Sequence, residues 1–475
     1  MLIWFVVLYL VVSICIGLYA ATKVKNSSDY VVAGRHLPLP FIVATVFATW
    51  FGSETVLGIP AKFLSEGLHG VVADPFGSSM CLILVGLFFA RPLYRMGLLT
   101  IGDYYRQRYS RTVELVVSLC IVLSYLGWVS AQVTAMGLVF NILTAGAIAP
   151  WQGMCIGLAI VMLYTLTGGM LSVAFTDLFQ MTVIVLGMIY IAYVVGNEAG
   201  GVGNVISHAS AAGKLEFWPE LDAKQIITFV AAWSTMALGS IPQQDVFQRV
   251  ASAKNERTAG NGSVMGGCLY FVFAFVPMFL AYSALLVDPN MVNEHLDKDT
   301  QYILPLLILN HTPFAVQVLF FGALISAILS CSSATLLAPS VTFAENIIRP
   351  FFPRLADYQF LRLLRFVVFL FGCGVLVFAL LSNETIYGMV ENAYKVTLVA
   401  AFTPLAFGLY WKRATNQGAV FAITAGLFVW ISLELFNPDG FFPPQFAGLL
   451  ASIGGMIVGS LLPQRIAAHA TRATG

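Results

Sequence analysis

Charged residues are scarce in this sequence of 475 residues. Asp, Glu, Lys and Arg make up 10% of it and hydrophobic residues 59%, whereas a soluble domain carries roughly 25% charged residues. This shortage excludes an ordinary soluble domain and predicts an all-α polytopic membrane protein. The formal net charge of +1 carries no information about partners by itself, and we expect no nucleic-acid partner.

Several chemical motifs are also missing. The seven cysteines form no CxxC pair, which excludes a zinc site and a disulfide framework. The sequence contains no Walker A motif and no nucleotide domain, and no ATPase subunit is expected. Any energy that the protein uses has to come from an ion gradient or from a solute itself. The sequence shows no paired His, Asp or Ser cluster suited to a membrane enzyme. We therefore expect no enzymatic activity and no organic cofactor.

Long apolar runs, in contrast, are abundant. A helix of about 20 apolar residues crosses the hydrocarbon core of a membrane. This length predicts about thirteen spans, centred near residues 12, 54, 82, 128, 158, 184, 233, 274, 327, 370, 398, 426 and 454. The first run lacks a basic residue before it and a convincing cleavage motif, so we expect a true span rather than a signal peptide.

The basic residues predict the orientation of these spans. Lys and Arg collect in cytoplasmic loops, and most of the 24 Lys and Arg fall in alternate loops if the N-terminus is outside and the C-terminus cytoplasmic. We therefore expect a multi-pass protein of the cell membrane that contacts membrane lipids. The exceptions are Lys62, Lys214, Lys224, Lys298 and Lys395.

Two predicted spans contain a break. Small, hydroxylic and acidic residues interrupt Phe41–Gly58 at Ala48–Glu54, and Gly239–Pro242 interrupts Ile227–Arg249. Irregular backbone at membrane depth is tolerated where it lines protein or a water-filled site. Paired broken helices are typical of inverted repeats in transporters. For the first segment alone, a kinked span with a buried glycine is an equal alternative.

The spacing of the breaks predicts an organisation in two repeats. Each interrupted span opens a set of five, and two further spans follow the second set. The expected divisions are 1–22 as a first helix outside the repeat core, 40–198 as the first repeat, 224–412 as the second repeat, 417–463 as two additional helices and 464–475 as a cytoplasmic tail.

Hydroxyl groups gather in the ninth span at Ser330, Ser332 and Ser333. Together with carbonyls released at a helix break, they suit a small hard cation such as Na⁺. Serines in membrane helices also pack against neighbours or bond to the preceding turn. These residues alone leave both interpretations open.

Four segments of the sequence occur together and in order: Ala33–Pro38, Thr167–Gln180, Gly239–Arg249 and Ser326–Ser333. Taken together, they resemble the sodium:solute symporter family. Within that family, the chain is most similar to the high-affinity choline transporters. The resemblance implies a leucine-transporter-type five-plus-five inverted repeat and secondary active, sodium-coupled symport of a small polar solute. The likeness to the choline transporters rests on Gly239–Arg249 and also on Ala48–Trp50, Gly86–Pro92 and Ile303–Pro305.

The resemblance also implies a sodium site between the first broken helix and the ninth span. Its expected ligands are the carbonyls of Ala48, Phe51 and Ala327 and the hydroxyl of Ser330. Cys331 stands where the family usually has Ser or Thr. Because a thiol is a poor ligand for a hard cation, we expect a weaker site, a site that recruits Ser332 or Ser333, or a vestigial one.

The implied substrate residues are an acid, Asp74, and two indoles, Trp50 and Trp128, whose π faces suit a cation. Gln243 replaces a third aromatic residue of the choline-transporter cage, and Glu54 is either a second substrate contact or a helix cap. We expect a cationic or amine-bearing, choline-like solute. The alternatives are a neutral solute such as an amino acid or a sugar and, in a different class, a transporter-like solute sensor.

Asp177 follows the Gly168-Gly169 turn. An acid there either caps the N-terminus of the next helix or takes part in the exit of sodium.

Overall fold

The computed structural model describes residues 2–296, 300–382 and 384–466. Within these ranges the regular elements are helices, and one isolated bridge joins Leu37 to Ala253. The prediction of an all-α protein is confirmed. Lys298 and the predicted tail beyond residue 466 lie outside the described residues.

The chain up to residue 211 contains the first interrupted span and the long helix α9. Its helices are α1 (Leu2–Ala21), α2 (Ser27–Val32), η1 (Ala33–Arg35), α3 (Leu39–Trp50), η2 (Glu54–Gly58), α4 (Ile59–Glu66), η3 (Leu68–Val71), η4 (Val72–Gly77), α5 (Ser78–Leu84), η5 (Val85–Phe89), α6 (Ala90–Arg95), α7 (Ile101–Arg108), α8 (Arg111–Leu143), α9 (Pro150–Glu198) and α10 (Val202–Ala211).

The remaining chain begins with the second interrupted span. Its helices are α11 (Ala223–Gly239), α12 (Gln244–Ser252), α13 (Glu256–Val287), α14 (Pro289–Leu296), η6 (Thr300–Tyr302), α15 (Ile303–His311), α16 (Phe314–Thr342), η7 (Phe343–Ile348), η8 (Arg349–Phe351), α17 (Asp357–Leu381), α18 (Ile386–Thr397), η9 (Leu398–Phe402), α19 (Thr403–Tyr410), α20 (Asn416–Phe436) and α21 (Pro444–Leu461).

The number of spans agrees with the sequence. Ten helices of the described residues are long and apolar enough to cross a membrane, and two bent pairs raise the number to twelve. α9 has 49 residues, roughly 74 Å at 1.5 Å per residue, which exceeds twice the hydrocarbon thickness of about 30 Å. Gly169 divides α9 with a φ of 51°, so that α9 provides two spans and the number becomes thirteen.

The two bent pairs are the interrupted spans. α3 meets η2 and α4 at 54°, and α11 meets α12 at 45°. The hydrogen-bond ladder of α3 ends at the Phe51 amide, which donates to the Phe47 carbonyl (2.9 Å). In the described part of the chain, no backbone amide donates to the carbonyls of Ala48 or Phe51. The first break therefore releases two carbonyl oxygens inside the protein.

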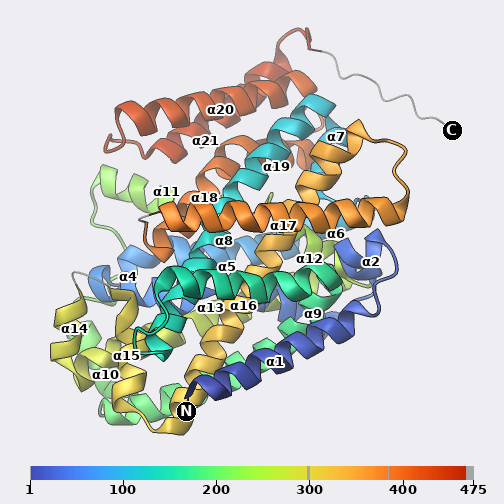
Figure 1. Cartoon of the computed structure of the whole chain (residues 1–475). Helices are drawn as coiled ribbons and strands as arrows, with labels where there is room; N and C mark the ends of the chain where they lie inside the picture. Colours follow the sequence, from blue (N-terminus) through green and yellow to red (C-terminus); the bar gives the residue numbers. More distant parts are fainter. Residues whose placement is uncertain (1, 297–299, 383, 467–475) are drawn as a thin grey trace.

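The helices extend between two ends of the molecule (Figure 1). α2, α6 and α7 lie toward one end, the right-hand side of the view, which we call the α7 end. α10, α14 and α15 lie toward the opposite, α15 end. α1 follows one edge, and α20 and α21 follow the other. α16 lies between them and is buried along most of its length.

The two interrupted spans are joined at the α7 end. The Leu37 amide donates to the Ser252 carbonyl and the Lys254 amide to the Leu37 carbonyl, both at 3.0 Å. Leu37 precedes α3, and Ser252 is the last residue of α12. This bridge therefore connects the α7-end halves of the two broken helices.

Candidate functional site

Three carboxylates line a narrow gap beside the first break. The gap is enclosed by η2, η4, α11 and α18 and has no room for a water molecule. No cationic side chain is part of its lining. Its residues are Glu54, Ala73, Asp74, Met236, Tyr387, Val390 and Glu391.

Glu54 is directed toward α8. Its Oε1 accepts a hydrogen bond from Trp128 Nε1 (3.3 Å) and its Oε2 accepts one from Gln132 Nε2 (2.6 Å). The same Gln132 accepts from the Ser53 amide at the break (2.9 Å). Gln132 therefore fixes both the backbone of the break and the carboxylate. A glutamine in the middle of an apolar span was the signal that could have identified it.

Asp74 is held by a neutral donor on α13. The Tyr270 hydroxyl donates to Asp74 Oδ1 (2.5 Å) and lies 3.1 Å from the Thr55 hydroxyl. Asp74 is 4% exposed. η4 and η2 thus present their acids to the same gap, and a tyrosine on α13 holds the orientation of one of them.

Three aromatic rings from three helices meet next to Glu54. The Trp50 and Trp128 ring centroids lie 5.4 Å apart, Trp50 and Tyr394 6.0 Å apart, and Trp128 and Tyr394 5.5 Å apart. The structure brings the two predicted indoles together and adds Tyr394 of α18, which the sequence reasoning missed. Its signal was the spacing of seven residues from Tyr387, which places both tyrosines on one helix face.

Gln243 lies at the second break with its amide already engaged. Its Nε2 donates to Ser124 Oγ (2.9 Å) and to Thr397 Oγ1 (3.3 Å). Thr397 in turn donates to the Gly239 carbonyl (2.7 Å). Gln243 therefore joins the second break to α8 and α18.

Asp177 connects three helices. Its Oδ1 accepts from the Ser330 hydroxyl (2.6 Å) and its Oδ2 from the Thr45 hydroxyl (2.5 Å). The residue stands well beyond the Gly169 break, inside a continuous helical stretch. The interpretation as a helix cap is therefore wrong, because both carboxylate oxygens bind side chains of α3 and α16. Thr45, a hydroxyl inside an apolar span, was not predicted.

Cys331 packs directly against the first break. A methyl group on Gly52 would lie 2.8 Å from Cys331 Sγ and 2.7 Å from Glu54 Oε2. Only a glycine allows this close approach. Ala327, one turn earlier on α16, is also fully buried. The thiol, the released carbonyls and the Glu54 carboxylate thus belong to one small region.

α12 carries charged groups into the protein interior. The Tyr125 hydroxyl donates to Asp245 Oδ1, and Arg249 Nη1 donates to the Asp245 backbone carbonyl (3.1 Å). Among the described residues, Asp245 Oδ2 and Arg249 Nη2 have no hydrogen-bond partner.

Comparison with known proteins identifies the family of this chain. The profile of the sodium:solute symporter family matches residues 30–426. The chain belongs to this family. Human high affinity choline transporter 1 is 27% identical, over 91% of this chain and 76% of the transporter. The osmoregulated proline transporter OpuE of Bacillus subtilis (strain 168) is 26% identical, over 98% of this chain and 96% of its own.

The symporter also shares its fold with solved transporters. A Na⁺-coupled sialic acid symporter in an outward-open state superposes with a TM-score of 0.82 at 18% identity, covering 97% of this chain and 96% of its own. Mhp1, a nucleobase-cation-symport-1 family transporter, gives 0.59 at 16% identity, covering 92% and 96%. The leucine-transporter-type inverted repeat is confirmed. The chain is a multi-pass membrane protein of a sodium-coupled symport family.

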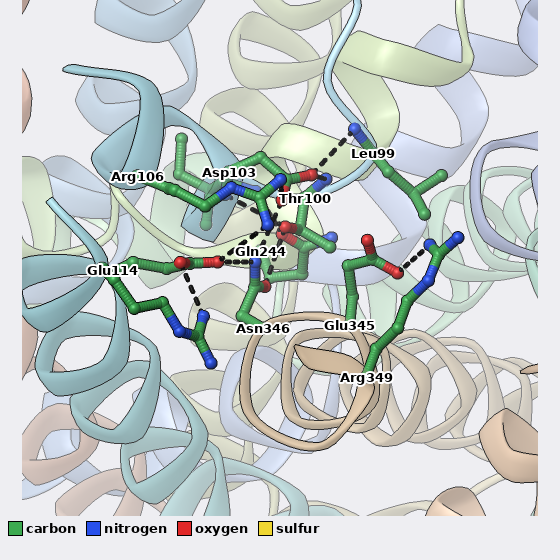
Figure 2. A network of polar contacts seen from close by, with 11 residues as sticks. Leu99, Thr100, Asp103, Arg106, Glu114, Gln244, Glu345, Asn346 and Arg349 are labelled. Carbon is green, nitrogen blue, oxygen red and sulfur yellow. Dashed lines mark hydrogen bonds and ion pairs between the residues drawn. The ribbon is translucent and has the colours of Figure 1, made fainter. Parts of the chain in front are cut away.

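A polar network joins several helices at the α7 end of the symporter (Figure 2). Asn346 Nδ2 donates to Glu114 Oε1 (2.9 Å) and to Asp103 Oδ1 (3.2 Å), and Thr100 Oγ1 donates to Asn346 Oδ1 (2.8 Å). Arg111 Nη1 lies 2.6 Å from Glu114 Oε2. Asn346, in η7 directly after α16, thereby joins α7 to α8.

The same network includes the second broken helix. The Ile101 amide donates to Gln244 Oε1 (2.8 Å) at the start of α12. A methyl group on Gly102 would lie 2.5 Å from the Asn346 side chain, so α7 packs closely on η7. α7 therefore links the α12 half-helix to α8 and η7.

An open cavity of about 410 Å³ lies on the other side of the gap, toward the α15 end. Tyr387 lines both this cavity and the carboxylate gap. Its ring thus forms a shared wall between an accessible space and an enclosed one. Other residues of the cavity are Gly58, Lys62, Thr134, Gln301 and Glu384.

Proposed function

We propose that this symporter imports a small cationic solute of the choline type together with Na⁺. The proposal rests on the excess of buried carboxylates over buried cationic side chains around the two breaks. Glu54, Asp74, Asp177 and Asp245 are at most 4% exposed, and Arg249 is the one buried guanidinium among the residues that the structure describes. No Lys, Arg or His side chain of the described ranges forms an ion pair with these four carboxylates.

Cations that enter with the transported species would compensate this excess of negative charge. An uncompensated buried charge costs several kcal/mol. Glu54 and Asp74 line the gap, and the aromatic cluster of Trp50, Trp128 and Tyr394 lies beside Glu54. A cation over an aromatic face gains about 0.5–2 kcal/mol. We therefore assign the gap and the cluster to the ammonium group of the solute.

For sodium we propose the site between the first break and α16. The carbonyls of Ala48 and Phe51, freed by the break, and the Ser330 hydroxyl support this assignment. Ala327 and Cys331 complete the proposed set. Asp177 binds the Ser330 hydroxyl from the side of α9, and we propose that it receives the ion on its way out.

We further propose that the α7 end faces the cytoplasm, with the N-terminus outside and the C-terminus inside. Arg106, Arg111 and Arg349 stand at this end, in agreement with the excess of basic residues in cytoplasmic loops. The Asn346 network then closes the cytoplasmic route, and Tyr387 closes the outer one.

A neutral amino acid is the second candidate, because a proline transporter matches nearly the whole chain. Its zwitterion would bring a carboxylate toward Glu54 and Asp74. Like charges repel strongly where water is excluded. The buried acids therefore favour a solute without a carboxylate.

Uptake of labelled choline into proteoliposomes tests the proposed function. One Na⁺ gains about 2.3 kcal/mol at −100 mV and about 1.4 kcal/mol from a tenfold gradient. We expect uptake that requires an inward Na⁺ gradient and that choline, but not proline, competes away. Undiminished uptake after K⁺ replaces Na⁺ would contradict the coupling. Binding without uptake would point to a sensor.

The change Ser330→Ala should raise the Na⁺ concentration for half-maximal uptake about tenfold. The loss of one oxygen ligand to a charged group is worth about 1.5 kcal/mol. The measurement is uptake as a function of Na⁺ concentration. Ser340→Ala is a matched control on the same helix, because its hydroxyl donates to the Leu336 carbonyl (2.8 Å). An unchanged Na⁺ dependence of Ser330→Ala would remove Ser330 from the site.

The change Cys331→Ser should lower the half-maximal Na⁺ concentration several-fold. A hydroxyl suits a hard cation better than a thiol, and Cys331 lies against the break. Cys81→Ser, which replaces another buried thiol on α5, should leave the half-maximal Na⁺ concentration unchanged. If Cys331→Ser also leaves it unchanged, the ion does not touch this position.

A further inference from the structure

We infer that Tyr394 determines specificity by binding a hydroxyl group carried by the cationic solute. This assignment rests on the proposed function and narrows its substrate class to hydroxylated ammonium compounds. Tyr394 has two parts that act separately. Its ring forms a wall of the aromatic cluster, and its hydroxyl forms a hydrogen bond with the solute.

The ring supplies the aromatic face that the sequence lacks at Gln243. Tyr394 lies nearly parallel to Trp50, with an interplanar angle of 15°, and at 59° to Trp128. Gln243 itself directs its amide to Ser124 and Thr397. A cation next to the three rings would meet aromatic surface from α3, α8 and α18. The cluster is thus complete without an aromatic residue at the second break.

The Tyr394 hydroxyl is buried and has no hydrogen-bond partner among the described residues. Seven other buried tyrosines of the core have a hydrogen-bond partner, and a buried hydroxyl left without a partner is unfavourable. A free hydroxyl on a ring of the aromatic cluster therefore points to a ligand atom. The satisfied tyrosines are Tyr30, Tyr104, Tyr105, Tyr109, Tyr125, Tyr164 and Tyr270.

The backbone holds Tyr394 between the two breaks. A methyl group on Gly239, at the second break, would lie 2.7 Å from the Tyr394 carbonyl. Trp50, at the first break, stacks on its ring. Movement of either half-helix would therefore displace the ring or its anchor. Tyr394 is therefore placed so that its contact with the solute would change when either half-helix moves.

The electrostatics favour a neutral hydroxyl over a carboxylate as the group that Tyr394 binds. Two carboxylates adjoin the cluster to which Tyr394 belongs. Glu54 accepts a hydrogen bond from Trp128, whose ring centroid lies 5.5 Å from that of Tyr394, and Asp245 accepts one from Tyr125, whose ring stacks on Trp128. A carboxylate placed there would be repelled by them, whereas a hydroxyl can donate to an acid and accept from the tyrosine. The expected solute is an ammonium compound with a hydroxyl group, not a betaine.

The test compares three labelled or competing solutes: choline, ethyltrimethylammonium, which lacks the hydroxyl, and glycine betaine, which has a carboxylate. For the unchanged symporter we expect choline to bind about tenfold more tightly than ethyltrimethylammonium, with betaine weakest. Tyr394→Phe should remove the preference for choline and leave the affinity for ethyltrimethylammonium unchanged. Tyr394→Leu should weaken both cations, because it removes the ring.

Tyr105→Phe is the matched control. The Tyr105 hydroxyl donates to the Ala401 carbonyl (2.9 Å). Its removal should therefore leave the ratio of the affinities for choline and ethyltrimethylammonium unchanged. An unchanged ratio in Tyr394→Phe would overturn the inference and leave the proposed function standing. If the unchanged symporter binds none of the cations in the presence of Na⁺, the proposed function fails and the inference fails with it.

Discussion

Asp74→Asn lowers the kcat/KM for choline uptake by at least about 100-fold. Removal of one partner from a buried charge pair costs about 3–5 kcal/mol, and the substitution preserves the volume of the side chain. The amide oxygen can still accept from Tyr270, which now donates to Asp74 Oδ1 (2.5 Å). The loss therefore reports the negative charge rather than the shape of the site. Uptake over a range of choline concentrations gives the measurement.

The thermal stability of Asp74→Asn separates a charge effect from misfolding. Without solute, Asp74 is a buried carboxylate with no ion-pair partner in the described residues. Its replacement by a neutral amide should leave the Tm unchanged or raise it. Addition of choline should raise the Tm of the unchanged protein only. Normal uptake by Asp74→Asn would remove this residue from the substrate site.

Asn346→Leu should shift the symporter toward a state open at the α7 end. The substitution removes the amide that donates to Asp103 and Glu114. Buried acceptors that lose a donor cost about 1–3 kcal/mol each, and water restores their partners when this end opens. A net change of about 2–3 kcal/mol corresponds to a shift of about 30- to 150-fold in the equilibrium.

Labelling of a cysteine at the second break measures this opening. Ser240 is fully buried, so Ser240→Cys should react slowly with an impermeant maleimide applied from the α7 side. The additional change Asn346→Leu should accelerate the reaction at least tenfold. Asn141→Leu is the control, because it removes an amide bonded to the Ile148 carbonyl (2.9 Å). It should not accelerate the labelling reaction. Equal labelling rates in all variants would show that the network does not control access.

The sequence predicted the features that arise from neighbouring residues. Apolar length gave the spans, and small or hydroxylic residues gave the break at Gly52. The indoles Trp50 and Trp128 were also identified, and the structure brings them to 5.4 Å. Each of these signals lies within one helix or in a motif of a known family.

The sequence could not predict the pairings between distant helices. Asp177 binds Thr45 and Ser330, which are 132 and 153 residues away, and its local context suggested a helix cap. Tyr394 joins the aromatic cluster because α18 packs beside both breaks. Such contacts depend on the packing of the repeats, which leaves no periodicity in the sequence of either partner.

The bridge at Leu37 connects the two broken helices at the α7 end, so that they are expected to move together there. Because Leu37 bonds to Ser252 and Lys254, α3 and α12 cannot swing apart without the loss of both hydrogen bonds. α3 carries carbonyls assigned to sodium, and α12 begins beside the second break. Under the proposed assignment of the sites, a movement of this joined pair of half-helices would change the sodium site and the solute site together.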